Sequence, residues 1–129
     1  VENGRICLVR QWRVALGEMT LEIPAGKLEE GEDPAACAAR ELTEETGLIA
    51  DGLELIAYSA GAPGFTNEAT RIFRATGLRR GSSHPDEGEF VDVVWLPVPD
   101  VVEAIAQGLI KDAKTIVATL DAARRLNIT

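Results

Sequence analysis

Residues 26–48 of the chain read GKLEEGEDPAACAARELTEETGL, and this stretch decides how the chain folds. Asp33 followed by Pro34 predicts a helix start, because Asp caps a helix and Pro fits its first turn. The helix is expected to continue over residues 35–46 and to end at Gly47, since glycine is favoured directly after a helix. The second half of this helix is acidic, and the functional interpretation below rests on its glutamates.

Three glutamates lie together on this predicted helix. Glu41 and Glu45 are four residues apart and share a face, and Glu44 stands beside them. Like charges at this spacing destabilise a bare helix, and a divalent cation would offset the repulsion because it takes carboxylate oxygens. Arg40, four residues before Glu44, is placed to hold that carboxylate. The alternative is a solvated acidic face, since most charge runs lie at the surface.

The glutamates belong to a longer pattern: Gly, five residues, Glu, seven residues, Arg-Glu-apolar-any-Glu-Glu-any-Gly-apolar. Its positions are Gly26, Glu32, Arg40, Glu41, Leu42, Glu44, Glu45, Gly47 and Leu48. Seven fixed identities at roughly one in fifteen each arise by chance at about 10⁻⁸ per start position. The stretch resembles the signature box of the Nudix hydrolases, without one departure.

The resemblance implies an α/β fold, with an α/β/α sandwich around a mixed β-sheet in one domain over residues 1–129. It also implies Mg²⁺ as cofactor, with Mn²⁺ as a substitute. The metal would neutralise a diphosphate, polarise its phosphorus and lower the pKa of the attacking water. Its expected ligands are Glu41, Glu45, Glu44 and the backbone carbonyl of Ala25.

Other box residues are expected to support the metal ligands. Glu32 and Arg40 would orient the helix and its carboxylates. A catalytic base is expected outside the box, on a loop before a late strand. Glu87 is the first choice for this base and Glu89 the second, and for both the alternative is a solvated loop carboxylate.

The resemblance covers essentially the whole chain and is nearest to the ADP-ribose pyrophosphatase branch. In that branch a proline follows the box glycine by sixteen residues, as Pro63 follows Gly47. The branch usually has Ser before this Pro-Gly, whereas this chain has Ala62. The stretches that carry the resemblance are 9–13 (VRQWR), 21–26 (LEIPAG), 61–68 (GAPGFTNE) and 108–115 (GLIKDAKT).

The same branch implies the substrate-binding residues. Arg13 matches a position that contacts the substrate diphosphate, and a guanidinium suits two phosphate oxygens; the alternative is a surface arginine. Glu68 matches a position near the terminal ribose, and a carboxylate can accept hydrogen bonds from the hydroxyl groups of the ribose. Phe65 either packs on the ligand or anchors its loop. Pro63 and Gly26 complete the expected substrate-binding set.

The function implied is Mg²⁺-dependent hydrolysis of ADP-ribose to AMP and ribose 5-phosphate. One alternative is hydrolysis of another nucleotide sugar or of a dinucleotide. An alternative of another class is a module that senses ADP-ribose without cutting it. Such modules usually have a degraded box and an attached DNA-binding segment, whereas this box is intact and no helix-turn-helix or basic patch is visible in the sequence.

Composition sets the remaining expectations. The net charge of −8 argues against sequence-independent nucleic-acid binding, and no apolar run approaches the length of a membrane span. Two cysteines are too few for a disulfide framework, which fits a cytoplasmic location. Branch members carry extra N-terminal strands that build a homodimer and help to hold the adenine, and we expect such strands to precede Val1 in the native protein.

Strands and helices are expected to alternate along the chain. Residues 11–20 are predicted to form a loop. Strands are predicted at 5–10, 21–23, 53–58, 69–76 and 90–96, and further helices at 98–107 and 114–126.

Overall fold

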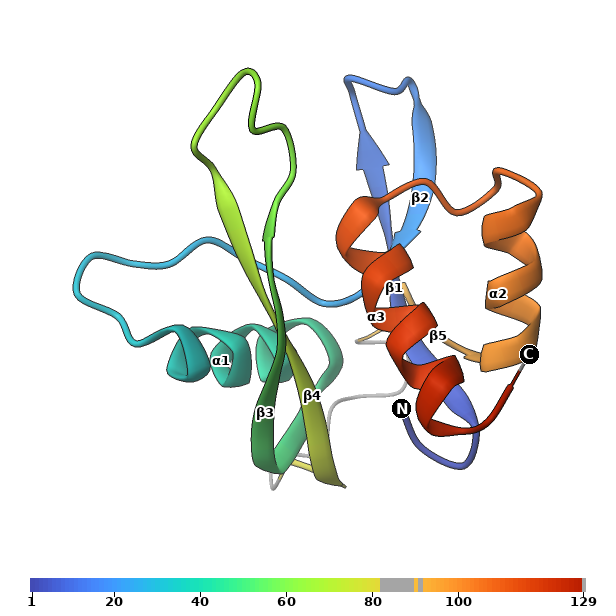
Figure 1. Ribbon diagram of the computed structural model, residues 1–129. Coiled ribbons are helices and arrows are strands. Elements are labelled where there is room, and N and C mark those ends of the chain that lie inside the picture. Colours follow the sequence, from blue (N-terminus) through green and yellow to red (C-terminus); the bar gives the residue numbers. More distant parts are fainter. Residues whose placement is uncertain (82–89, 91, 129) are drawn as a thin grey trace.

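The computed structural model describes residues 1–81, 90 and 92–128, which contain both strands and helices, with α1 between two groups of strands and α2 and α3 at the end (Figure 1). This order agrees with the expected α/β fold. The helices described are too short or too polar to cross a membrane. The elements are β1 (Arg5–Arg13), β2 (Glu18–Glu22), α1 (Pro34–Thr46), β3 (Leu48–Ala60), β4 (Ala69–Arg80), β5 (Val93–Pro97), α2 (Val98–Ala106) and α3 (Ala113–Arg125).

The strands form two sheets. One has the order β2-β1-β5 and the other consists of β3 and β4. Every strand pair among the described residues is antiparallel, so the mixed sheet that we expected is not seen among them. In Figure 1, α1 lies beside the β3–β4 sheet, and α2 and α3 lie beside the three-stranded sheet.

The predicted loop over residues 11–20 is wrong, because β1 and β2 form a hairpin there. β1 continues to Arg13, and Trp12 pairs with Met19 across the hairpin. Both side chains of that pair are more than half exposed. The hairpin end therefore lacks the alternation of buried and exposed residues by which a strand is predicted from sequence.

Helix α1 forms as its sequence predicts. The Asp33 side chain accepts a hydrogen bond from Ala36 N at 3.1 Å, which satisfies one of the free N–H groups of the first turn. Gly47 ends the helix in the left-handed region at φ 75°, and its N–H donates to the Thr43 carbonyl at 2.8 Å. β3 begins at the next residue, Leu48, so the end of α1 is fixed against the β3–β4 sheet.

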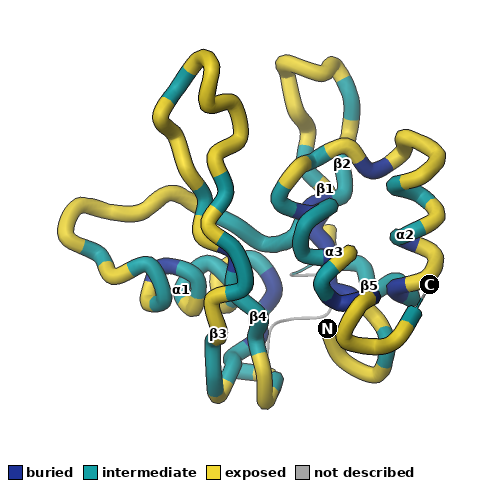
Figure 2. Tube along the Cα trace, viewed as in Figure 1, coloured by how far each residue is buried: buried dark blue, intermediate teal, exposed yellow. Residues whose placement is uncertain are grey.

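The main hydrophobic core lies between β1 and the two C-terminal helices (Figure 2). Leu8 on β1 and Val98 on α2 are fully buried. The core fixes β1 against the two C-terminal helices, and these elements carry Arg13 and Lys114. The buried cluster consists of Ile6, Leu8, Val98, Val101, Ile110, Ala122 and Ala123.

A buried ion network joins β2 to the start of α3. Glu22 is only 1% exposed and accepts hydrogen bonds from Arg13, Lys114 and Thr20. The hydrogen bonds from Arg13, followed by those from Lys114 and Thr20, outweigh burial and lower the pKa of Glu22 to about 2. The carboxylate therefore stays ionised in the folded protein.

This network should make the stability depend on acid pH. The folded-state pKa of Glu22, about 2, lies below its ordinary value of 4.5, so its contribution is complete above pH 4.5 and is lost as the pH falls toward 2. At 1.36 kcal/mol per pKa unit the contribution is about 3 kcal/mol, of which a little more than half is lost by pH 3.

Urea unfolding of the wild type and Glu22→Gln between pH 7 and pH 3 measures this contribution. We expect the difference in free energy of unfolding to shrink below pH 4.5. The matched control is Glu18→Gln, because Glu18 lies on the same strand as Glu22 and pairs with Lys111 at the surface. This substitution should change the free energy of unfolding by less than about 1 kcal/mol. A difference between wild type and Glu22→Gln that stays constant down to pH 3 would contradict the assignment.

Candidate functional site

The last two turns of α1 face the loop that follows β2. Ala25 N donates a hydrogen bond to Glu45 Oε2 at 3.2 Å. Gly26 lies so close to Glu41 that a Cβ atom at residue 26 would stand 2.1 Å from the Glu41 carboxyl carbon. Only glycine permits this approach of the backbone to the carboxylate. The structure thus brings together three residues of the box, Gly26, Glu41 and Glu45, with Ala25, the expected backbone ligand.

Arg40 holds the carboxylates around it in place. Its Nε and Nη2 donate to the two oxygens of Glu32 at 2.9 and 3.0 Å, in the bidentate geometry that suits a guanidinium and a carboxylate. Its Nη1 donates to Glu41 at 2.8 Å and to Glu44 at 3.3 Å. The hydrogen bonds from Arg40, with one from the Glu29 N–H, lower the pKa of Glu32 to about 2. Arg40 therefore ties the loop before α1 to the acidic face.

The acidic face carries more negative than positive charge. Burial raises the pKa of Glu45, the charge of Glu41 adds to the rise, and the hydrogen bond from Ala25 opposes it. The only cation that contacts Glu41 and Glu44 among the hydrogen bonds of the described residues is Arg40. Carboxylate oxygens and a backbone carbonyl are the donors that Mg²⁺ prefers, so the donor set suits a hard divalent cation.

These donors do not form a closed metal shell as they stand. Within the described ranges, no three side chains of Asp, Glu, His or Cys converge on one point. Glu41 Oε1 is taken by Arg40, and Glu45 Oε2 by the Ala25 N–H. A bound metal would therefore compete with Arg40 for Glu41.

Arg13 stands at the end of β1 and is anchored by Glu22. Its Nε and Nη2 donate to the two carboxylate oxygens at 2.7 Å each. The bonds to Glu22 are the main reason why the pKa of Arg13 is raised, and Asp112 and Glu45 also contribute. Arg13 is therefore near enough to Glu45 for their charges to interact, while its side chain remains 45% exposed.

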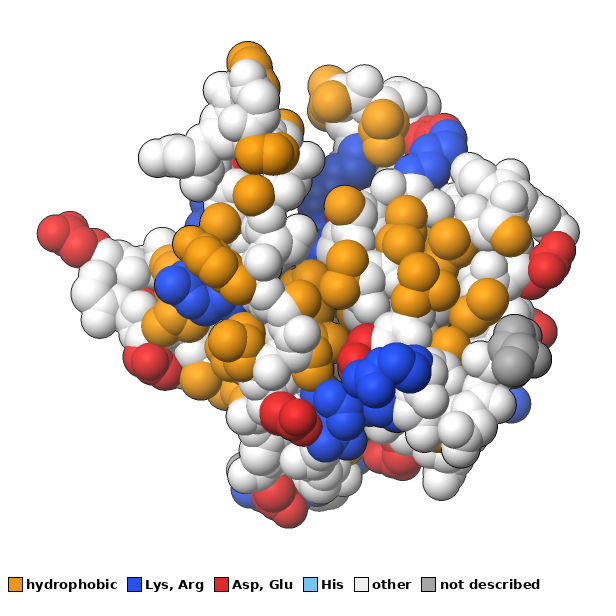
Figure 3. Space-filling model, viewed as in Figure 1, with side chains coloured by type: hydrophobic (Ala, Val, Ile, Leu, Met, Phe, Trp, Pro, Cys, Tyr) orange, Lys and Arg blue, Asp and Glu red, His pale blue; other side chains and the backbone are white. Residues whose placement is uncertain are grey.

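The candidate residues Pro63, Phe65 and Glu68 lie on the loop between β3 and β4. The N–H groups of Phe65 and Thr66 both donate to the Ala62 carbonyl at 2.9 Å, which forms a turn. The Phe65 side chain is 91% exposed, so it does not anchor the loop. Figure 3 shows this loop and the β1–β2 hairpin on opposite sides of a notch, with Lys or Arg atoms at its floor.

The two candidate bases lie outside the described part of the chain. Glu87 and Glu89 belong to residues 82–89, for which the structure gives no placement. Their choice as catalytic base stays a sequence-based expectation.

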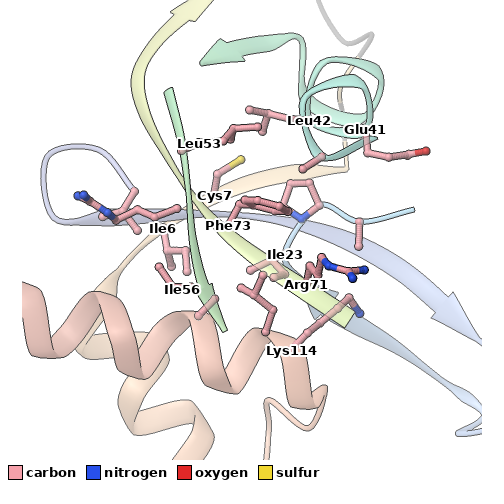
Figure 4. Close-up of a pocket in the computed structure, with 18 of the residues that line it drawn as sticks. Ile6, Cys7, Ile23, Glu41, Leu42, Leu53, Ile56, Arg71, Phe73 and Lys114 are labelled. Atoms are coloured by element: carbon pink, nitrogen blue, oxygen red, sulfur yellow. The ribbon is translucent and has the colours of Figure 1, made fainter. Parts of the chain in front are cut away.

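A cavity of about 830 Å³ lies between the two sheets (Figure 4). Apolar residues from both sheets and from α1 make up much of its wall, among them Cys7, Leu42 and Phe73. Glu41 and Lys114 are among its polar lining residues. Lys114 was not singled out from the sequence, although it lies within residues 108–115, which carry part of the family resemblance.

Comparisons with known proteins bear on the family of the chain. The model of the NUDIX domain matches residues 1–119. The ADP-ribose pyrophosphatase of Bacillus subtilis (strain 168) is 40% identical over 119 residues, which make up 91% of this chain and 64% of that protein. The methanol dehydrogenase activator of Bacillus methanolicus is 40% identical over 118 residues, 90% of this chain and 64% of that protein.

A solved structure agrees with the fold. The crystal structure of an ADP compounds hydrolase is similar with a TM-score of 0.79 and 25% identity, and the match covers 98% of this chain and 68% of that one. The chain spans slightly less than two thirds of the length of the two curated relatives it matches. The chain belongs to the Nudix hydrolase family, as its box predicts.

Proposed function

We propose that this chain hydrolyses the diphosphate bond of ADP-ribose, giving AMP and ribose 5-phosphate. The observation that carries the proposal is the acidic face of α1, where Glu41 and Glu45 lie directly against the Ala25–Gly26 loop. Similarity to an ADP-ribose pyrophosphatase and to an ADP compounds hydrolase supports this choice of substrate class. Hydrolysis of another nucleotide sugar or of a dinucleotide is the second candidate, because the same face would serve any such diphosphate.

Mg²⁺, or Mn²⁺ in its place, would be held by Glu41, Glu45, Glu44 and the carbonyl of Ala25. When bound, the metal supplies charge neutralisation at the diphosphate and lowers the pKa of a water molecule. Arg40 keeps Glu41 and Glu44 at the rim of the site through its hydrogen bonds to both. Metal binding would therefore draw Glu41 and Glu44 away from Arg40.

Arg13 would bind the diphosphate oxygens at the end of β1. Glu22 occupies two of its five N–H groups, and the side chain is 45% exposed. Glu68, Pro63 and Phe65 would contact the ribose side of the substrate from the β3–β4 loop. Glu87, with Glu89 as second choice, would accept the proton of the attacking water.

Further properties are proposed for the full-length protein. We place it in the cytoplasm as a homodimer without a nucleic-acid partner. The two cysteines of the chain are free and buried thiols, which agrees with a reducing compartment. The net charge of −8 agrees with a small anionic substrate bound through metal rather than with a nucleic acid.

AMP release from ADP-ribose tests the proposal directly. With Mg²⁺ the wild type should release AMP, and Glu45→Gln should lower kcat by at least about 100-fold because it removes a metal ligand. Glu103→Gln, an exposed glutamate on α2, is the control and should leave kcat unchanged. EDTA should abolish the wild-type activity. Equal activity of wild type and Glu45→Gln would exclude the acidic face as the metal site.

A methyl group at residue 26 tests the contact between loop and helix. Gly26→Ala places a Cβ atom against the Glu41 carboxylate and must displace it. We expect kcat to fall by about 10- to 100-fold, as when the support of a metal ligand is disturbed, with little change in melting temperature.

The matched control is Gly61→Ala, since a Cβ atom there meets nothing within 4 Å. Steady-state kinetics with ADP-ribose and Mg²⁺ compares the two variants. Full activity of Gly26→Ala would mean that the position of the Glu41 carboxylate is not critical.

A further inference from the structure

The short segment that follows β2, residues 23–26, is held through its N–H groups at two points. Ile23 N donates to the hydroxyl oxygen of Thr115 at 2.9 Å, and Ala25 N donates to Glu45 Oε2 at 3.2 Å. The residue between them is a proline, which has no N–H to donate. Among the described residues, no other hydrogen bond comes from an N–H group of this segment. Its position therefore depends on one partner in α3 and one in α1.

The Thr115 hydroxyl is oriented by a carboxylate. Thr115 lies in the first turn of α3, and its Oγ1 donates to Oδ2 of Asp112, the N-cap residue of that helix, at 2.6 Å. A hydroxyl has only one hydrogen to donate, so its oxygen is left to accept from the Ile23 N–H. Hydrogen bonds in such a chain strengthen one another, because each polarises the next. Asp112 therefore acts on the segment after β2 through Thr115.

The start of α3 does not itself require this hydroxyl. Asp112 already caps the helix by accepting from the Thr115 N–H at 3.2 Å. A second fully buried threonine, Thr119, stands one turn later on the same helix, and its hydroxyl finds no partner in the described part of the chain. The Thr115 hydroxyl differs by its bond to Ile23, which is 92 residues away in the sequence. That bond is the feature to be explained.

The segment leads directly into the candidate metal face. Ala25, the expected backbone ligand, comes two residues after Ile23, and Gly26 lies against Glu41. A carbonyl group has no side-chain torsions by which to reach a metal, since the peptide planes on both sides fix it. A metal that draws on the Glu45 carboxylate would weaken its bond to the Ala25 N–H. The bond to α3 would then be the remaining anchor of the two.

We propose that Thr115 is a positioning residue for metal binding, whose hydroxyl, oriented by Asp112, fixes the segment that carries the Ala25 carbonyl. The proposal rests on the proposed function in that it takes Glu41, Glu45 and this carbonyl as metal ligands. In this role Thr115 touches neither the metal nor the substrate and acts through the backbone. Removal of such a support lowers metal affinity about 10- to 100-fold.

Two substitutions at residue 115 separate the hydroxyl from the volume of the side chain. Thr115→Val keeps nearly the same shape and removes the hydroxyl, whereas Thr115→Ser keeps the hydroxyl and removes a methyl group. Mn²⁺ binding is measured without nucleotide by electron paramagnetic resonance, and binding that Glu45→Gln abolishes is assigned to the acidic face. The Kd for Mn²⁺ should rise about 10-fold in Thr115→Val and stay within about 3-fold of the wild type in Thr115→Ser.

Thr119→Val is the matched control, because it removes from the same helix a buried hydroxyl without a partner in the described ranges. It should leave the Kd for Mn²⁺ unchanged and should not lower the melting temperature, since no hydrogen bond is lost.

The Mg²⁺ dependence of ADP-ribose hydrolysis gives a second readout. The Mg²⁺ concentration for half-maximal activity should rise about 10-fold in Thr115→Val, while kcat at saturating Mg²⁺ changes less than about 3-fold. A fall in kcat that saturating Mg²⁺ does not restore, with an unchanged Kd for Mn²⁺, would overturn the proposal.

Melting temperatures separate metal binding from folding. If Thr115→Val does not fold, Thr115→Ala takes its place and is compared with Thr115→Ser, since these two differ only by the hydroxyl. A lower melting temperature of Thr115→Val with an unchanged Kd for Mn²⁺ would reduce Thr115 to a structural contact between α3 and β2. A Kd raised equally in Thr115→Ser or in Thr119→Val would also overturn the proposal.

The two proposals fail in different ways. If the wild type releases no AMP from ADP-ribose, the proposed function fails, and the Mn²⁺ titration without nucleotide still decides the role of Thr115. A weaker Kd in Thr115→Val alone would then support a positioned metal site that serves another substrate. A wild type that binds Mn²⁺ no better than Glu45→Gln would overturn the role of Thr115.

Discussion

Repulsion among the carboxylates of α1 is the constraint on which the rest of the site depends. Glu41, Glu44 and Glu45 stand within two helical turns, at spacings that destabilise an isolated helix. The surroundings offset this repulsion from two sides. Arg40 donates to Glu41 and Glu44, and the Ala25 N–H donates to Glu45. The loop before α1 and the residues on the helix are thus held together by the same carboxylates that we propose as metal ligands.

Much of the fold could be predicted because the signals are local. Asp33, Pro34 and Gly47 act within one helical turn of themselves, so the bounds of α1 follow from the sequence almost to the residue. β3 was harder, since it begins at Leu48 rather than at residue 53. The earlier residues of this strand are held by β4 rather than by a local pattern: Gly52, for example, pairs with Thr76, which is 24 residues away in the sequence.

The site was predictable only where the box describes it. The glutamates, Arg40 and Gly26 are identified by their spacing, and the structure brings them together. Lys114 could not be found in this way, because Glu22 and Lys114 are 92 residues apart and neither belongs to the box. The exposure of Phe65 could not be predicted either, since an aromatic residue in a Gly-rich loop is compatible with a buried position as well as with a solvent-facing one. Tertiary contact, not local pattern, decides both cases.

The shared carboxylate of Glu22 also limits the order in which this site can change during evolution. Loss of Lys114 leaves Glu22 still bonded to Arg13 through both oxygens, so the buried charge keeps a partner. Loss of Glu22 first would take from Arg13 both of its bonds to a carboxylate and leave Lys114 with Asp112 alone, a costlier intermediate. Substitutions here are therefore epistatic. A descendant with a different substrate can lose or exchange a cation first, whereas replacement of the carboxylate costs less once one of the cations has changed.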